Sequence, residues 1–231
     1  TLTIIGVIAA ITIPTVIMPN NDKLFIEKLK KAYSTLNNAM EDAISIHGEV
    51  GYWNIYENNS SEKFVNYLKP YLNIGKNCTA QDKCVPENIK TINGDDLETT
   101  FNADQSYYKM ILSDESIIWI KQHATSNNNC NTTAGGYNNI CATIYMDING
   151  YKGPNRIGKD VFRMQISPSA VFADNSDDCD SDGEGWGCTK YALKNGNENY
   201  VLKSKKTSEN DNDDINEDEG KDNEINFTDI L

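Results

Sequence analysis

Six cysteines are the residues whose type and spacing most clearly predict chemistry in this sequence. Six cysteines allow fifteen pairings, but each closure between nearest neighbours stays within one polar loop. An even count with short spacings is typical of disulfides formed in an oxidising compartment. The competing interpretation is a zinc site, yet the chain has no C-x-x-C motif and only two histidines. The disulfides we predict are therefore Cys78–Cys84, Cys130–Cys141 and Cys179–Cys188.

Residues 178–183 read D-C-D-S-D-G, which matches the opening half of a calcium-binding loop. The closing glutamate is missing, because Thr189 stands at the twelfth position and leaves Glu184 or Asp177 to replace it. The alternative interpretation is a solvated acidic loop. Ca²⁺ is the one cofactor that the sequence suggests, and no cofactor is required. The candidate ligands are Asp178, Asp180, Asp182 and Glu184.

A second group of oxygen-bearing side chains surrounds the Gly-Pro turn: Asp147, Asn149 and Asp160. These residues allow a second oxygen-rich site. The pattern favours a structural role, in which the side chains cap the turn by accepting hydrogen bonds from nearby backbone amides.

Catalytic patterns are weak. Neither His47 nor His123 has the surrounding spacing of a Ser/His/Asp, Cys/His or phosphate-binding motif, and His47 is expected in the core or at a helix end. The three tryptophans are expected in a core or interface: Trp53, Trp119 and Trp186. We predict that the chain is not an enzyme.

The charge of the chain argues against nucleic acid as a partner. The 231 residues carry a net charge of −13, whereas a phosphate backbone requires clustered Lys and Arg. The segment Lys203–Leu231 contains ten acidic residues and four lysines, and it shows no hydrophobic periodicity. Residues 204–231 are therefore expected to be a mostly disordered acidic tail.

The N-terminal segment Thr1–Met18 contains no charged residue and has the minimum length for a membrane span. Pro14 lies inside it and removes one helical hydrogen bond. Because the apolar run begins at the first residue, its start is expected to be missing or already processed. The simplest interpretation of this segment is a transmembrane anchor.

The helical pattern continues beyond the apolar run. Apolar residues recur at steps of three and four up to a predicted stop at Gly48, which makes residues 23–48 amphipathic. A helix from Thr1 to His47 would be about 70 Å long. Its second half is expected to pack on a head domain through Phe25, Leu29, Tyr33, Leu36, Met40, Ile44 and His47.

Residues 49–203 are expected to form that globular head. Ser61–Leu72 indicates a short helix, and the strand patterns predict an antiparallel sheet. A long N-terminal helix packed on a small antiparallel sheet, with disulfide-stapled loops, is an α+β fold. The predicted strands are Ser106–Leu112 and Ser116–Gln122, which form a hairpin, then Ile140–Ile148, Val161–Ile166 and Asn199–Leu202.

Three segments resemble a known family. IIGVIAAITIP at Ile4–Pro14 is similar to the N-terminal segment of type IV pilins and type II secretion pseudopilins. DINGYKGPNRIGKDVF at Asp147–Phe162 and GWGCTKYALKNGNENY at Gly185–Tyr200 resemble the heads of bacterial prepilin-type proteins. The resemblance implies a prepilin leader removed by a peptidase, methylation of the new N-terminus, and an assembly glutamate. Those features would precede Thr1.

The resemblance also implies partners and a location. The partners would be copies of this chain, other pilin-like subunits, the prepilin peptidase and an inner-membrane assembly platform. The chain would reside in the bacterial inner membrane before assembly, with its head in the periplasm or outside the cell. Residues 1–22 would form the membrane-spanning and filament-core half of the helix, with small residues allowing close approach. The expected interface is Leu2, Ile4, Ile5, Gly6, Val7, Ile8, Ala9, Ala10, Ile11, Ile13, Pro14, Val16 and Ile17.

The sequence therefore predicts a structural subunit of a type IV pilus-like or type II secretion filament. The first alternative is a membrane-anchored extracytoplasmic binding module, calcium-dependent or not, that does not polymerise. The second is an anchored envelope enzyme.

Overall fold

Helix α1 spans Leu2–His47 and ends where the sequence predicts. Gly48 has a φ of 74°, and its backbone amide donates to the carbonyl oxygen of Ile44 at 2.8 Å. Such a left-handed residue is the usual way to close a helix, and glycine adopts it without a steric penalty. The computed structural model describes residues 2–55, 61–79, 82–123, 130–180 and 182–196, with side chains from residue 22 onward. The predicted strand Asn199–Leu202 and the acidic tail lie outside the described residues.

The described part of α1 buries one apolar stripe. The stripe is close to the predicted one, since Leu29, Leu36 and Met40 are buried. One isoleucine and three alanines fill the remaining contact positions of the same face, and the small alanine side chains let the helix lie close to its neighbours. These additional buried residues are Ile26, Ala32, Ala39 and Ala43. His47 is exposed and does not enter the core, but it is the last residue of α1, the helix-end position that was the other expectation, and its ring meets that of Tyr67 edge-on with 5.2 Å between the ring centroids.

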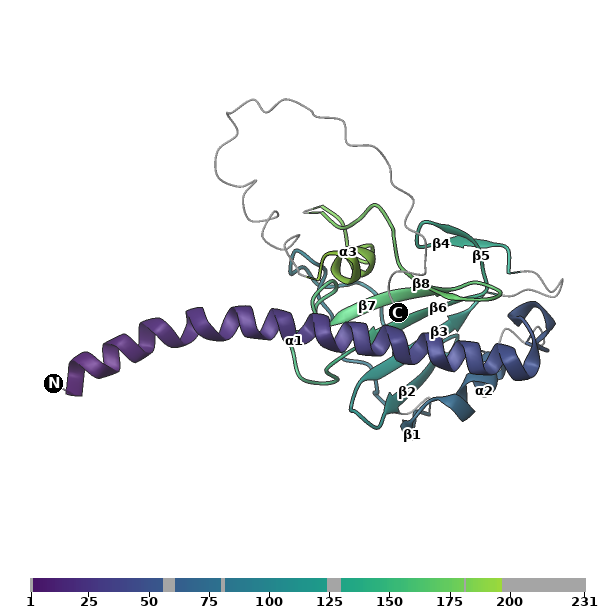
Figure 1. Cartoon of the computed structure of the whole chain (residues 1–231), viewed down its shortest axis with the longest axis horizontal. Coiled ribbons are helices and arrows are strands. Elements are labelled where there is room, and N and C mark those ends of the chain that lie inside the picture. The colour runs from purple at the N-terminus through teal and green to yellow at the C-terminus, as the bar shows by residue number, and fades with distance from the viewer. Residues whose placement is uncertain (1, 56–60, 80–81, 124–129, 181, 197–231) are drawn as a thin grey trace, which may run out of the picture.

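The main sheet is antiparallel, with the strand order β1-β2-β3-β6-β7-β8, and α1 lies across one of its faces (Figure 1). The predicted hairpin is confirmed, with Met110 opposite Ile118 in neighbouring strands. The strand predicted at Val161–Ile166 has the predicted bounds, and the one predicted at Ile140–Ile148 contains β6. The strands are β1 Ile74–Asn77, β2 Tyr108–Leu112, β3 Ile117–Gln122, β6 Ala142–Asp147, β7 Val161–Ile166 and β8 Val171–Ala173.

Both faces of the sheet centre are covered, so β3 is buried along most of its length. Ile118 and Ile120 face the core beneath α1, whereas Ile117 and Trp119 face a second apolar cluster. This second cluster contains Phe101 and Trp186 from segments outside the sheet. A strand buried on both faces needs a continuous apolar run, and β3 has one in Ile117–Ile120.

Shorter elements complete the head and confirm the α+β class. The predicted helix at Ser61–Leu72 is confirmed as α2 followed by a 3₁₀ turn. A separate two-stranded ribbon lies beside the main sheet, and α3 covers part of β7 and β8 (Figure 1). The bounds are η1 Val50–Tyr52, α2 Ser61–Leu68, η3 Lys69–Tyr71, β4 Thr132–Ala134, β5 Tyr137–Ile140 and α3 Cys188–Asn195.

Candidate functional site

Helix α1 is the element predicted to drive assembly. Its side chains are described from residue 22 onward, where the helix packs on the sheet. The Tyr33 hydroxyl donates to the Val171 carbonyl at 3.0 Å, which ties the helix to the edge strand β8. Burial raises the pKa of Tyr33, so this hydroxyl keeps its proton and remains a donor. Near the start of the described side chains, Lys159 forms an ion pair with Asp22 at 3.2 Å. The helix is therefore fastened to the head at two points, Asp22 and Tyr33.

The predicted membrane and filament interface, Leu2 to Ile17, lies outside the residues whose side chains are described. Within the described part of the chain, no helix has the length and apolarity that crossing a membrane requires.

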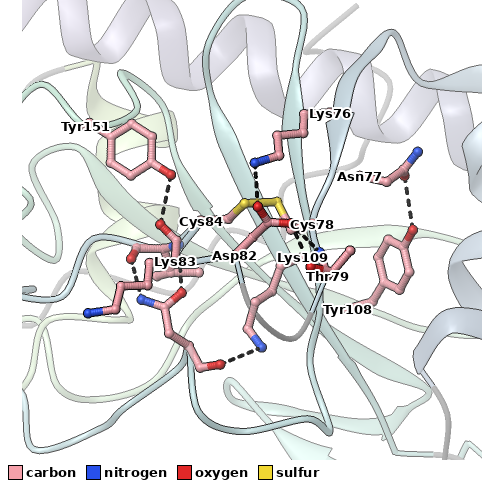
Figure 2. Close-up of a disulfide and its surroundings, with 12 residues drawn as sticks. Lys76, Asn77, Cys78, Thr79, Asp82, Lys83, Cys84, Tyr108, Lys109 and Tyr151 are labelled. Atoms are coloured by element: carbon pink, nitrogen blue, oxygen red, sulfur yellow. Dashed lines mark hydrogen bonds and ion pairs between the residues drawn. A yellow bond between two sulfur atoms is a disulfide. The ribbon is translucent and has the colours of Figure 1, made fainter.

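The first disulfide, Cys78–Cys84, closes a loop after the edge strand β1 (Figure 2). Asp82 lies inside that loop and accepts hydrogen bonds from the Lys76 ammonium at 2.7 Å and the Thr79 amide at 2.8 Å. The Lys76 hydrogen bond and the Thr79 amide and hydroxyl lower the pKa of Asp82 to about 2. Tyr151, from the turn that follows β6, donates to the Lys83 carbonyl at 3.0 Å. The loop is thus held by a covalent bond and by polar contacts to two other segments.

The other two predicted disulfides are also present. Cys130–Cys141 links the start of the β4–β5 ribbon to the residue that precedes β6. Cys179–Cys188 links the acidic segment to the first residue of α3. All three pairs join near neighbours in sequence, and the structure therefore has no free cysteine.

The acidic segment 178–184 uses its carboxylates mainly to order its own backbone. Asp178 accepts hydrogen bonds from the Gly187 amide at 2.6 Å and the Trp186 amide at 3.2 Å, just before α3. Asp180 accepts from the amides of Asp182 and Gly183 at 3.0 and 2.8 Å. Over the described residues, no group of three or more His, Cys, Asp or Glu side chains is placed to hold a metal ion. Calcium binding by this segment stays a prediction.

Asp174 begins the acidic run and forms a buried ion pair with Arg163 of β7. The Arg163 Nε donates to Asp174 Oδ2 at 2.6 Å, and the Asp174 side chain has no exposed surface. Burial opposes ionisation of Asp174, but the Arg163 hydrogen bond and charge outweigh it and lower the pKa of the carboxyl group. Further hydrogen bonds come from the Gln165 amide at 2.6 Å and the Ser176 hydroxyl at 2.7 Å. Sequence reasoning missed this pair, because no local pattern connects the two residues.

The predicted capping role is confirmed for Asp147 and Asp160, whereas the Asn149 side chain donates to the Gly153 carbonyl at 3.2 Å. Asp147 accepts a hydrogen bond from the Asn149 amide at 3.1 Å. Asp160 accepts from the amides of Asn155 and Arg156 at 2.9 and 2.6 Å. Both carboxylates are buried without exposed surface. Burial, with the nearby Asp160 charge, raises the pKa of Asp147 to about 8.

Comparison of the chain with family models, with curated proteins and with solved structures found no match.

His123 takes part in a hydrogen-bonded row across the sheet. Its Nε2 lies 2.7 Å from the Thr143 hydroxyl, which donates to Gln165 Oε1 at 2.8 Å. Since that hydroxyl proton points at Gln165, the imidazole Nε2 is the donor to Thr143. Gln165 in turn donates to Asp174. These hydrogen bonds link the end of β3, β6 and β7 to the buried ion pair. Their role is therefore structural.

Burial, aided by the positive charge of Lys121, lowers the pKa of His123 to about 4. The unfolded chain binds a proton at this imidazole below about pH 6.5, and the folded chain does so only near pH 4. We therefore expect the free energy of unfolding to decrease as the pH falls from about 6.5 to 4. Denaturant unfolding across this range should show a shallower decrease for His123→Gln. An identical pH dependence in the variant and the wild type would contradict this assignment.

Proposed function

We propose that this chain is a pilin-like structural subunit that polymerises through its N-terminal helix into a type IV pilus-like or type II secretion filament. One observation carries the proposal. The apolar segment that resembles a pilin N-terminus, Ile4–Pro14, continues in one helix, α1, into the segment that packs on the head. When subunits polymerise, the apolar N-terminal halves of their helices would pack together as the filament core, and the heads would lie around it.

The interactions within the head are consistent with a structural subunit. Two-sided burial of β3, three disulfides and the Arg163–Asp174 ion pair all stabilise one fold. The partners under this proposal are copies of the chain, other pilin-like subunits, and the membrane platform and peptidase that handle them. The location is the bacterial inner membrane before assembly and the periplasm or cell exterior afterwards.

The proposal is tested by placing one lysine on either half of α1. We expect Ile8→Lys to remove the chain from sheared surface filaments, because a charge in a closely packed apolar helix bundle is strongly unfavourable. Glu27→Lys is the matched control, since Glu27 is exposed on the described half of the helix and should leave the filaments intact. Sheared and membrane fractions of cells expressing the gene are compared by blotting and electron microscopy.

Two results would count against polymerisation. The first is assembly that Ile8→Lys leaves unchanged. The second is a wild-type chain found only in the membrane fraction, never in filaments. The second result would favour the anchored binding module instead. The circular dichroism of the heads should be the same in both lysine variants, which separates assembly from misfolding.

A further inference from the structure

We propose that the turn between β6 and β7 is a binding site for a single hard divalent cation of the calcium class, formed by Asp147, Asn149, Asn155 and Asp160. The proposal concerns a different segment from the acidic loop at residues 178–184. It is independent of the filament proposal.

The fold brings the two carboxylates together. Asp147 is the last residue of β6 and lies opposite Val161, the first residue of β7, so Asp160 is its neighbour across the strand pair. The amide of Ile148 donates to the Asp160 carbonyl at 2.9 Å, which fixes this spacing. The charge of Asp160 raises the pKa of Asp147, and Asn149 hydrogen-bonds to the Asp160 side chain.

Three oxygen atoms in this turn are buried and lack a hydrogen-bond partner. They are Asp147 Oδ2, Asn149 Oδ1 and Asn155 Oδ1. Asp147 has no exposed surface, and Asn149 is only 7% exposed. Buried polar atoms in folded proteins nearly always have a partner, so three unpartnered oxygens in one turn need a donor or a cation. Asn149 Oδ1 and Asn155 Oδ1 are acceptors, and the raised pKa of Asp147 means that its carboxyl group holds a proton near neutral pH unless a cation displaces it.

The ligand set suits calcium better than zinc. It consists of carboxylate and amide oxygens, which hard cations prefer, and contains no sulfur or imidazole nitrogen. Two neighbouring buried acids can both be ionised only beside a compensating positive charge, and burial and the Asp160 charge raise the pKa of Asp147 in the metal-free chain. Lys28 of α1 lowers the pKa of Asp147 less than burial and the Asp160 charge raise it. A divalent ion would neutralise both acids at once.

The turn is also held in place before any ion binds. Gly150 has a φ of 68°, and a Cβ there would lie 2.4 Å from the Glu115 carbonyl oxygen. Tyr151 is hydrogen-bonded to the Lys83 carbonyl beside the first disulfide (Figure 2). Further along the turn, the Lys90 amide donates to the Asn155 carbonyl at 2.9 Å. A turn fixed at three points loses little conformational freedom when it binds a ligand.

Calcium titration of the full chain tests the site, in mild detergent after removal of metal with EDTA. Isothermal titration should detect binding of one Ca²⁺ per chain. At a Ca²⁺ concentration 100 times the dissociation constant, the folded-to-unfolded ratio should rise about 100-fold over the EDTA sample. Asp147→Asn and Asp160→Asn should abolish this response. Asp178→Asn, in the other acidic segment, should retain it.

Asn155→Ala provides a variant that keeps both carboxylates. It removes one amide oxygen but retains the backbone amide that donates to Asp160, so the metal-free protein should unfold as the wild type does. We expect its calcium affinity to fall about tenfold. The proposal is overturned if the wild type shows no calcium response. It is also overturned if the response survives in Asp147→Asn and disappears in Asp178→Asn, which would place the ion in the other loop.

Discussion

Asp174→Ala is expected to lower the free energy of unfolding by about 3–5 kcal/mol, because it leaves the Arg163 guanidinium without its anion. The arginine side chain is only 18% exposed, so water replaces the lost carboxylate poorly. The substitution also leaves the Gln165 amide and the Ser176 hydroxyl without their acceptor. Denaturant unfolding of the two proteins at neutral pH measures the difference.

Asp177→Ala is the matched control for this prediction. Asp177 belongs to the same acidic run but is exposed, so its loss should change the free energy of unfolding by no more than about 0.5 kcal/mol. Replacing both partners of the ion pair with apolar residues, in Arg163→Met/Asp174→Leu, should be less harmful than Asp174→Ala alone. Equal losses for Asp174→Ala and Asp177→Ala would show that the buried pair contributes nothing specific.

Cys130→Ala/Cys141→Ala is expected to lower the free energy of unfolding by about 3 kcal/mol, a value set by the length of the loop that the bond closes. Eleven positions separate the two cysteines. Cys141 also aligns the sheet, since its amide donates to the Ile166 carbonyl at 2.7 Å and its carbonyl accepts from the His123 amide at 2.7 Å. Losing the bond therefore loosens the chain where it enters β6. Urea unfolding under non-reducing conditions measures the change.

The same pair of substitutions at Cys78 and Cys84 supplies the comparison. That bond closes a shorter loop of sequence separation 6, and its polar contacts remain when the sulfur atoms are removed. We expect a loss of about 2 kcal/mol there. The prediction for Cys130 and Cys141 is contradicted if their replacement costs less stability than the replacement at the shorter loop.

Features encoded by neighbouring residues could be predicted from the sequence. The three disulfides join near neighbours, so spacing alone indicated the pairs. The helix stop at Gly48 and the hairpin of β2 and β3 likewise depend on residues close together in the chain. The strand that contains the apolar run Ile117–Ile120 was also predicted, although its burial on both faces was not.

Features that depend on distant segments could not be predicted. Strands β1 and β8 are too short for a periodic pattern, and they form only because a longer neighbour offers its free edge. The Arg163–Asp174 pair requires β8 to return beside β7. The turn residues Asp147 and Asp160 were recognised as caps from their local setting. That Asp147 Oδ2 is buried without a hydrogen-bond partner became visible only after the strands were paired.

The short strands at the two borders of the sheet bear on how the heads behave when many copies are crowded together. An edge strand presents unpaired backbone donors and acceptors to any copy nearby. Long, flat edge strands therefore promote aggregation. Here β1 has four residues with an irregular register and exposed lysine, and β8 has three residues and is tied to Tyr33. Each border is too short to template a neighbour. Contacts between heads in a filament would therefore have to come from other surfaces.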